Sequence, residues 1–294
     1  MRGVVFFLCW LAVCASVPAQ AAPCRGNPQA LGTSRVITVT PAEYPKVGTV
    51  HYNSSLQLPL NDHEVVLTFD DGPLAPYTEQ ILDALAKECV RATFFMVGRQ
   101  ASAAPDLTRR VYNAGHVIGT HSQNHPLTFD QMPIEAAQRE IDDGIASVAS
   151  ALGDKRAVAP FFRIPGFLRV AAVEDYLASQ AITVWSTDID ADDWYKTASP
   201  QDIVTKAMTR ITQKGRGIIL LHDVHPATAQ ALPLLLNELK SHGFKVVQVA
   251  PAGKRVALRD VRTAPDKMAW PRLFRDRPRA EPRRPRYRWS YSAR

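Results

Sequence analysis

Short apolar runs alternate with longer amphipathic stretches along most of this sequence, from Glu64 onward. The runs are rich in β-branched and aromatic residues, as buried strands are, whereas the stretches between them have the apolar spacing of helices. Seven such runs interleaved with helices predict an α/β fold with parallel strands, and their number favours a distorted or incomplete (β/α) barrel over a doubly wound open sheet. No Gly-x-Gly-x-x-Gly follows the first run, which argues against a dinucleotide-binding fold. The predicted strands are Val65–Phe69, Ala92–Val97, Val117–Thr120, Pro160–Ile164, Ile182–Thr187, Gly217–Leu221 and Lys245–Val249.

The first residues have the pattern of a targeting segment. Arg2 precedes an uncharged apolar run that is shorter than the roughly 20 residues needed to span a bilayer. Ala19-Gln20-Ala21 fits a small-residue cleavage site, so we expect a signal peptide and an exported protein that is periplasmic, in the cell envelope or secreted. An uncleaved anchor is the alternative. By composition the chain divides into a signal peptide (1–21), an irregular N-terminal arm (22–62), one globular domain (63–250) and a basic tail (251–294).

Removal of the signal peptide would leave two cysteines, Cys24 and Cys89. In an exported protein such a pair is consistent with one disulfide, here between the arm and the first predicted helix. A buried free thiol at Cys89 is the alternative. Neither cysteine resembles a metal ligand, because the chain has no Cys-x-x-Cys pair.

Most of the positive charge lies at the C-terminal end of the chain. Lys254–Arg294 contains fourteen Lys or Arg and four Asp or Glu, a net charge of +10, which leaves −3 for residues 1–253 out of the total of +7. This tail lacks apolar periodicity, so we expect it to be disordered and able to bind an anionic polymer or a membrane surface through its charge. A solvated tail without a specific partner is the alternative. Export and the lack of a recognisable module argue against nucleic acid as a partner.

Polar residues that could carry chemistry follow several of the predicted strands. Asp70 and Asp71 end the first strand, and two adjacent carboxylates repel each other and are costly to bury unless a cation or hydrogen bonds compensate. In a (β/α) barrel the carboxyl ends of the strands meet at one rim, where active sites form. We therefore expect one site at these strand ends, built from Asp70, Asp71, His121, His125, Arg163, Asp190, Asp193 and His222.

The spacing of His121 and His125 places two imidazoles on one face if the segment is helical, so that both can chelate one ion. Two His and one Asp would leave coordination positions open, as a catalytic ion requires. This ligand set suits zinc, and also cobalt or nickel. Only one of Asp70 and Asp71 is needed as a ligand, so the other is free to act as a base on a water that the ion polarises.

The remaining rim residues suit roles around that base. Arg163 could orient and tune a neighbouring aspartate, with a surface ion pair as the alternative. His222 ends a buried run, and with an acidic partner it would hold a proton near neutral pH and serve as a general acid. Asp193, next to Trp194, is the candidate partner.

In order and spacing these segments resemble the five motifs of the polysaccharide deacetylases, which form carbohydrate esterase family four and share the NodB homology domain. The resemblance covers about Glu64 to Val249 and implies that the globular domain (63–250) is a catalytic domain with a distorted (β/α) barrel. The segments that carry it are Thr68–Pro73, His121–Pro126, Arg163-Ile164-Pro165, Asp190–Trp194 and Leu221-His222-Asp223.

The resemblance also implies a reaction and a set of residue roles. The implied reaction is hydrolysis of the N-acetyl group of N-acetylglucosamine units, which releases acetate and leaves a free amine. The implied cofactor is a divalent metal, commonly zinc, held by one Asp and two His. By position, the metal ligands would be Asp71, His121 and His125, the base Asp70, the acid His222, and their supporting residues Arg163 and Asp193.

The third motif departs from the family pattern. The family usually has an aromatic residue and then Gly after Arg-x-Pro, whereas this sequence has Gly166 and then Phe167. The backbone N–H after the proline, which the family uses as an oxyanion donor, could still come from Gly166. The aromatic wall is either displaced to Phe167 or missing, so the departure concerns the fit of the substrate and not the type of reaction.

We therefore expect an exported, metal-dependent N-deacetylase that acts on an N-acetylglucosamine-containing glycan of the peptidoglycan, chitin or chitooligosaccharide type. A catalytically impaired carbohydrate-binding protein on the same fold is the alternative. Such a protein would be expected to lose its acid or base, yet Asp70 and His222 are both present. A glycosidase with paired carboxylates does not fit, because adjacent Asp70 and Asp71 cannot flank a scissile bond from opposite sides.

Overall fold

The computed structural model of this chain describes residues 24, 26–52 and 57–253. The predicted signal peptide and nearly all of the basic tail lie outside these described residues. Within them, no helix is both long and apolar enough to cross a membrane.

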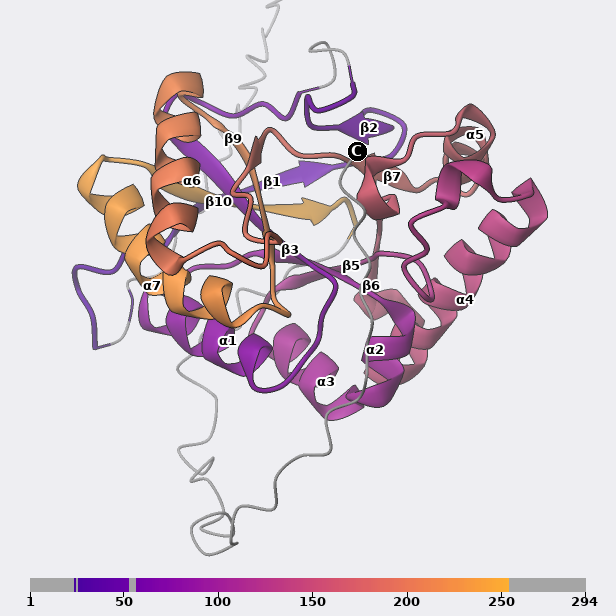
Figure 1. The fold of residues 1–294 in the computed structure, drawn as a ribbon, viewed down its shortest axis with the longest axis horizontal. Coiled ribbons are helices and arrows are strands. Elements are labelled where there is room, and N and C mark those ends of the chain that lie inside the picture. The colour runs from indigo at the N-terminus through magenta and orange to yellow at the C-terminus, as the bar shows by residue number, and fades with distance from the viewer. Residues whose placement is uncertain (1–23, 25, 53–56, 254–294) are drawn as a thin grey trace, which may run out of the picture.

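The strands in the described part form one ten-stranded sheet, and all paired strands run parallel (Figure 1). They are β1 (Thr33–Val39), β2 (Lys46–Val47), β3 (Glu64–Asp70), β4 (Thr93–Met96), β5 (Val117–Thr120), β6 (Val158–Phe162), β7 (Thr183–Trp185), β8 (Ile189–Asp190), β9 (Gly217–His222) and β10 (Lys245–Pro251). The order is β1-β10-β3-β4-β5-β6-β7-β2, with β9 beside β3 and β8 beside β9. Because the end strands β1, β2 and β8 do not pair with one another in the described part, the sheet does not close, and the prediction of an incomplete parallel barrel is confirmed.

All seven predicted strands are present, but the description of residues 22–62 as an irregular arm is wrong at β1 and β2. β8 was also not predicted. β2 and β8 have two residues each, too few to show a period of alternation. β1 contains polar residues whose partners come from distant parts of the chain; for example, the Ser34 hydroxyl donates to the Val246 carbonyl at 2.9 Å.

A disulfide and an ion pair are among the links that fasten the N-terminal arm to the rest of the fold. A disulfide joins Cys24 to Cys89, which follows the end of α1 (Tyr77–Lys87). The predicted pairing is therefore confirmed, and the alternative of a free thiol at Cys89 is wrong. Arg35 in β1 donates from Nε and Nη2 to the two carboxylate oxygens of Glu64 in β3, at 2.8 and 2.6 Å. The described part of the arm is therefore an integral piece of the sheet.

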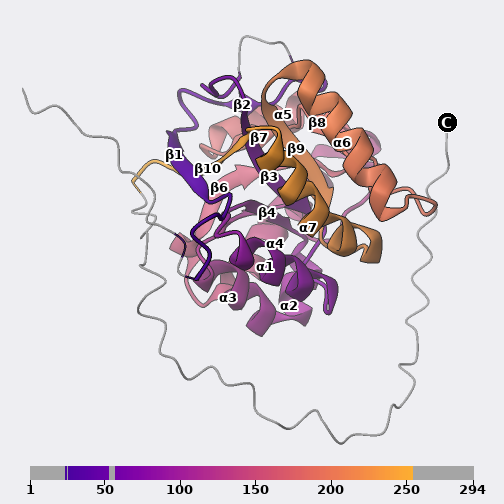
Figure 2. The same ribbon diagram turned by 90° about the vertical axis from the view of Figure 1, so that its left-hand side faces the viewer.

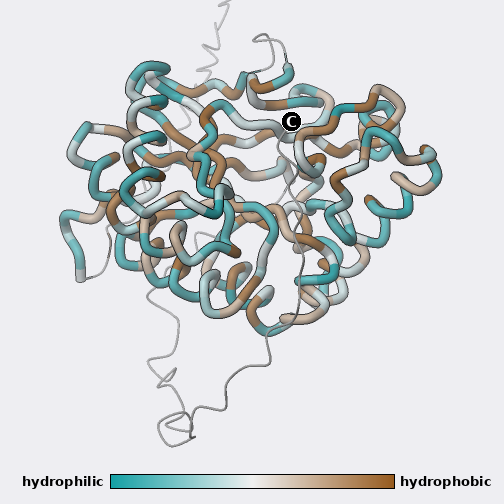
Figure 3. Tube along the Cα trace, viewed as in Figure 1, coloured by the Kyte–Doolittle hydropathy of each residue, from teal (hydrophilic) through white to brown (hydrophobic). Residues whose placement is uncertain are grey.

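Helices cover the outside of the sheet as a belt (Figures 1 and 2). They are α1, α2 (Gly98–Ala103), α3 (Pro105–Asn113), α4 (Ile134–Leu152), α5 (Ala171–Ser179), α6 (Pro200–Lys214) and α7 (Pro226–Ser241). Along the belt α6 packs on α7, α7 on α1, α1 on α3, α3 on α4 and α4 on α5. Apolar segments concentrate on the inner strands in Figure 3, and in α1 the residues Ile81, Leu82 and Leu85 face inward with helical spacing.

The parallel register brings the carboxyl ends of the strands to one rim. Asp70 at the end of β3 is in register with His222 at the end of β9, and Thr120 at the end of β5 is in register with Phe162 at the end of β6. Every residue of β3 and of β9 is buried. Rigid, buried strands thus hold the residues that follow them at the rim, where active sites of barrel proteins form.

Candidate metal centre and active site

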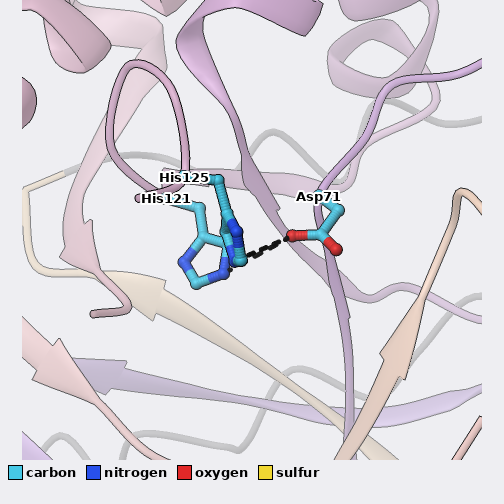
Figure 4. Close-up of side chains that lie close together, drawn as sticks. All are labelled: Asp71, His121 and His125. Atoms are coloured by element: carbon cyan, nitrogen blue, oxygen red, sulfur yellow. Dashed lines mark ion pairs between the residues drawn. The ribbon is translucent and has the colours of Figure 1, made fainter. Parts of the chain in front are cut away.

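Three buried side chains at the rim converge as a candidate metal centre. Asp71 follows β3, and His121 and His125 lie in the loop after β5. The Asp71 Oδ1 atom is 3.6 Å from His121 Nε2 and 3.4 Å from His125 Nε2, and Figure 4 shows the two rings facing the carboxylate. One donor atom from each residue lies within 4.8 Å of the others, which is close enough for all three to bind a single ion.

The loop that carries the two histidines is not a helix, so the conditional prediction that they share a helical face does not apply. Ser122 and His125 instead have φ angles of 64° and 58°, in the left-handed region. Such angles cost about 1–3 kcal/mol per residue and are kept only where the surroundings fix them. Here the His125 N–H donates to the Ser122 hydroxyl at 2.9 Å, and the turn brings the His125 ring to 4.7 Å from the His121 ring.

The chemistry of these residues fits a divalent metal. Asp71 Oδ1 is buried and has no hydrogen-bond donor among the described residues, so a cation is the partner that it lacks. Burial lowers the pKa of His121 to about 3 and also lowers the pKa of His125, which keeps both imidazoles neutral, as metal ligands must be. His121 Nδ1 lies 2.6 Å from the Arg163 carbonyl, a contact that leaves Nε2 as the ligand atom.

Asp70, next to the candidate ligand, is held by Arg163. The guanidinium is fully buried, and its Nη1 donates to Asp70 Oδ1 at 2.7 Å and to the Thr68 hydroxyl at 3.0 Å. Nη2 donates to the Ser186 carbonyl at 2.8 Å. The alternative of a surface ion pair for Arg163 is therefore wrong. Burial raises the pKa of Asp70 to about 6 against the opposing charge of Arg163, and Asp70 Oδ2 lies on the side of the candidate metal, 3.7 Å from His121 Nε2.

The predicted partnership of His222 with Asp193 is present. His222 Nδ1 lies 2.7 Å from Asp193 Oδ1, and Oδ2 of the same carboxylate accepts from the His222 N–H at 2.7 Å and from the Thr228 hydroxyl at 2.6 Å. Burial alone would lower the pKa of His222, but the charge of Asp193 and its hydrogen bond outweigh burial and raise the pKa to about 10. An imidazole that is held and charged in this way can donate a proton, which is the role predicted for His222.

Three other residues border the site without joining the triad. Asp190 lies in β8 and accepts from the Asp192 N–H at 2.8 Å, so it shapes the loop that leads to Asp193. The His225 ring is 5.8 Å from the His222 ring. The Phe167 ring is 5.9 Å from the Arg163 guanidinium, so it lies beside the site, and its role as a displaced aromatic wall stays a prediction.

Sequence reasoning gave no role to Asp223, although it lies within the fifth motif. Its carboxylate is buried and accepts from the Gly72 N–H at 3.0 Å and from the Thr78 hydroxyl at 2.6 Å. Burial raises its pKa to about 7. An acidic residue directly after a buried strand was the signal that identified Asp70 and Asp71, and the same signal applies to Asp223.

Fold and site together define a class of protein, an incomplete (β/α) barrel with a candidate metal centre at the carboxyl ends of its strands. A family model described as polysaccharide deacetylase matches residues 57–185. A peptidoglycan-N-acetylglucosamine deacetylase of Bacillus cereus is 34% identical over 202 residues, which cover 66% of this chain and 90% of that protein. This chain belongs to the polysaccharide deacetylase family.

Other relatives extend the comparison. The peptidoglycan-N-acetylglucosamine deacetylase PgdA of Listeria monocytogenes is 34% identical over 189 residues, 63% of this chain, but the match spans only 38% of that longer protein. The solved peptidoglycan deacetylase Bd3279 of Bdellovibrio bacteriovorus matches with a TM-score of 0.65 at 30% identity, over 81% of this chain and 65% of that one. A mutant of BA3943, described as a CE4 family pseudoenzyme with restored enzymatic activity, matches with a TM-score of 0.57 at 26% identity, over 65% of this chain and 67% of that one.

Proposed function

We propose that this protein is an exported, metal-dependent hydrolase that removes N-acetyl groups from N-acetylglucosamine units of a glycan such as peptidoglycan or a chitooligosaccharide. The observation that carries the proposal is the buried Asp-His-His triad flanked by an arginine-held aspartate and an aspartate-held histidine. Membership of the deacetylase family supports the reaction, and the names of the bacterial relatives support the class of glycan.

In this proposal Asp71, His121 and His125 hold the metal, with zinc as the first choice and cobalt or nickel as alternatives. When bound, a divalent ion lowers the pKa of a water molecule and draws electron density from the acetyl carbonyl. The neutral imidazoles and the carboxylate that lacks a hydrogen-bond donor are the features that fit the ion.

The remaining residues divide the proton transfers. Asp70, oriented by Arg163, takes a proton from the attacking water as the water oxygen bonds to the acetyl carbon. His222, held by Asp193, gives a proton to the amide nitrogen as the C–N bond breaks. The backbone N–H of Gly166, in the turn Pro165–Phe167, is the candidate donor to the oxyanion. Acetate and a free amine leave.

Two observations support export. The Cys24–Cys89 disulfide is typical of proteins that fold outside a reducing cytosol. Peptidoglycan, which several relatives act on according to their names, lies outside the cell membrane. The signal peptide over residues 1–21 stays a prediction that N-terminal sequencing of the exported protein would test.

The direct test is the release of acetate and free amines from chitooligosaccharides and from purified peptidoglycan. We expect activity that a chelator abolishes and that added zinc restores, because a bound ion would activate the attacking water. A protein with metal confirmed in the site and no activity on any N-acetylated glycan would contradict the proposal.

A carbohydrate-binding protein without catalysis is the second candidate, favoured by the BA3943 pseudoenzyme relative and by the exchanged positions of Gly166 and Phe167. The presence of both Asp70 and His222, each with its supporting partner, favours the enzyme. Glycan pull-down with the metal-loaded protein separates the two, because a binding protein would retain the glycan without releasing acetate.

A further inference from the structure

Asp71 occupies an unusual backbone position for a residue that must aim its side chain. Its φ angle is 78°, in the left-handed region that non-glycine residues rarely adopt. The oxygen that faces the two imidazoles has no hydrogen-bond donor in the described part of the chain, so no direct hydrogen bond sets its direction. The direction of the carboxylate therefore depends on how firmly the backbone around Asp71 is held.

Asp223 holds that backbone on both sides of Asp71. Before it, the Asp223 N–H donates to the Asp70 carbonyl at 3.2 Å, which extends the pairing of β9 with β3 by one step. After it, the Gly72 N–H donates to Asp223 Oδ1 at 3.0 Å. Asp223 is thus the partner of both residues that flank Asp71.

A second hydrogen bond fixes the Asp223 carboxylate itself. The Thr78 hydroxyl, in the first turn of α1, donates to Asp223 Oδ2 at 2.6 Å and accepts from the Leu74 N–H at 2.8 Å. The carboxylate packs so closely on Gly72 that a Cβ added there would lie 2.1 Å from Oδ2. Glycine is therefore required at position 72 by this contact, and the turn, the helix and the carboxylate are joined by packing and hydrogen bonds.

We propose that Asp223 is a positioning residue for the candidate metal centre, which it serves by fixing the turn that aims Asp71 at His121 and His125. This inference rests on the metal-binding part of the proposed function. It assigns to Asp223 no contact with the metal or the substrate. A purely structural role, in which Asp223 only joins β9 to α1, is the competing explanation.

The test measures metal binding to the full chain. Co²⁺ affinity and the visible absorption spectrum of the bound Co²⁺ are compared in the unchanged protein, Asp223→Ala and Asp223→Asn, with Zn²⁺ affinity measured by chelator competition. Loss of a group that orients a ligand typically lowers metal affinity by about 10- to 100-fold, which we expect for Asp223→Ala together with a changed spectrum. Asp223→Asn keeps an oxygen acceptor for the Gly72 N–H but replaces Oδ2, the acceptor of the Thr78 hydroxyl, with an N–H donor, so its loss of affinity is expected to be smaller than that of Asp223→Ala and close to that of Thr78→Val.

Two substitutions of Thr78 form a matched pair that leaves the charge of the Asp223 carboxylate unchanged. Thr78→Val removes the hydroxyl that fixes Asp223 Oδ2 and is expected to lower Co²⁺ affinity in the same direction as Asp223→Ala, by a smaller factor. Thr78→Ser keeps the hydroxyl and is expected to bind as the unchanged protein does. This pair decides the question if Asp223→Ala does not fold, as judged by circular dichroism.

Three results would overturn the inference. Unchanged Co²⁺ affinity and spectrum in folded Asp223→Ala would leave only a structural role, whatever the loss of stability. Equal losses in Asp223→Ala and Asp223→Asn would assign the effect to the charge and not to the hydrogen bond. Equal affinity in Thr78→Val and Thr78→Ser would remove the proposed link to α1. An unchanged protein that binds Co²⁺ but does not deacetylate glycans would refute the proposed function while leaving this inference standing.

Discussion

Asp70 and Asp71 are adjacent in the chain, yet their surroundings suit them to different tasks. Asp70 Oδ1 accepts from the Arg163 guanidinium at 2.7 Å, an arrangement that orients a base. Asp71 Oδ1 faces two neutral imidazoles and lacks a donor in the described part, an arrangement that suits a metal ligand. The pair therefore avoids sharing one environment, where two like charges would oppose each other's ionisation.

Substitutions at these two positions should separate metal binding from turnover. Asp71→Ala is expected to lose zinc, because it removes the only carboxylate of the triad. Asp70→Asn is expected to keep zinc and to lower turnover by about 100- to 10 000-fold, the usual contribution of a general base. Zinc content after dialysis and the rate of acetate release measure the two effects. Zinc loss in Asp70→Asn, or normal turnover, would contradict the assigned roles.

The pH profile should respond to the partner of His222. A general acid must be protonated to act, so turnover falls as the pH rises through its pKa, which Asp193 helps to raise to about 10 against the effect of burial. Asp193→Asn removes that negative charge and should lower the pKa of His222. We expect the alkaline limb of the profile of kcat against pH to move to lower pH.

Thr228→Val is the matched control for this effect. It removes one hydrogen bond to Asp193 but keeps the charge of the carboxylate, so a smaller displacement of the alkaline limb is expected. An alkaline limb that stays in place in Asp193→Asn would show that His222 is not the acid that limits turnover.

Residue positions were predictable from the sequence where they depend on strand ends. Asp71, His121, Arg163 and His222 each end or directly follow a buried apolar run, and parallel strands bring such residues together. The same argument could have identified Asp223, which directly follows β9. What sequence could not supply is the left-handed turn at His125, because that conformation depends on hydrogen bonds formed only in the folded loop.

At the scale of elements, the short strands and the edge strands were the parts of the fold that could not be predicted from the sequence. β1 alternates only weakly between buried and exposed residues, since its polar side chains bond to distant segments such as Glu64 in β3. β2 pairs with β7 for two residues and lies near the gap in the sheet. Long amphipathic helices such as α1 and α4 were predictable because their apolar spacing is a local property.

The disulfide between the arm and the end of α1 should contribute measurably to stability. Cys89→Ser is expected to lower the free energy of unfolding by about 2–4 kcal/mol, because the cross-link closes a long loop in the unfolded chain. Denaturant unfolding of the unchanged protein with and without reductant measures the same loss. Reductant should have no further effect on the stability of Cys89→Ser. An unfolding curve of the unchanged protein that is the same with and without reductant would contradict the prediction.

At the scale of the whole molecule, charge is divided between a mildly acidic body and a strongly basic C-terminal segment, −3 for residues 1–253 and +10 for Lys254–Arg294. Truncation after Gly253 is expected to leave deacetylation of short, neutral chitooligosaccharides unchanged. Binding to anionic phospholipid vesicles at low salt should fall, because electrostatic attraction to the surface is lost.

Co-sedimentation with vesicles at low and high salt measures that binding. A full-length protein with Arg283, Arg284 and Arg286 replaced by Gln serves as the control and should bind with intermediate strength. Equal binding of the truncated and full-length proteins would show that the basic segment does not recognise such a surface.

The pairing of β1 with β10 has a consequence for how the molecule is made. Thr33 and Val246 are partners in this ladder, so β1, the first of the described strands, can pair only after β10, the last of them, has been made. Pairings of such long sequence separation form slowly, and a chain that stops before β10 leaves the edges of β1 and β3 open to other chains. A chain that ends before Pro251, at the far end of β10, would therefore lack part of the strand that joins β1 to β3. We expect such shortened chains to be more prone to aggregation than the folded protein, because unpaired strand edges can pair with other chains.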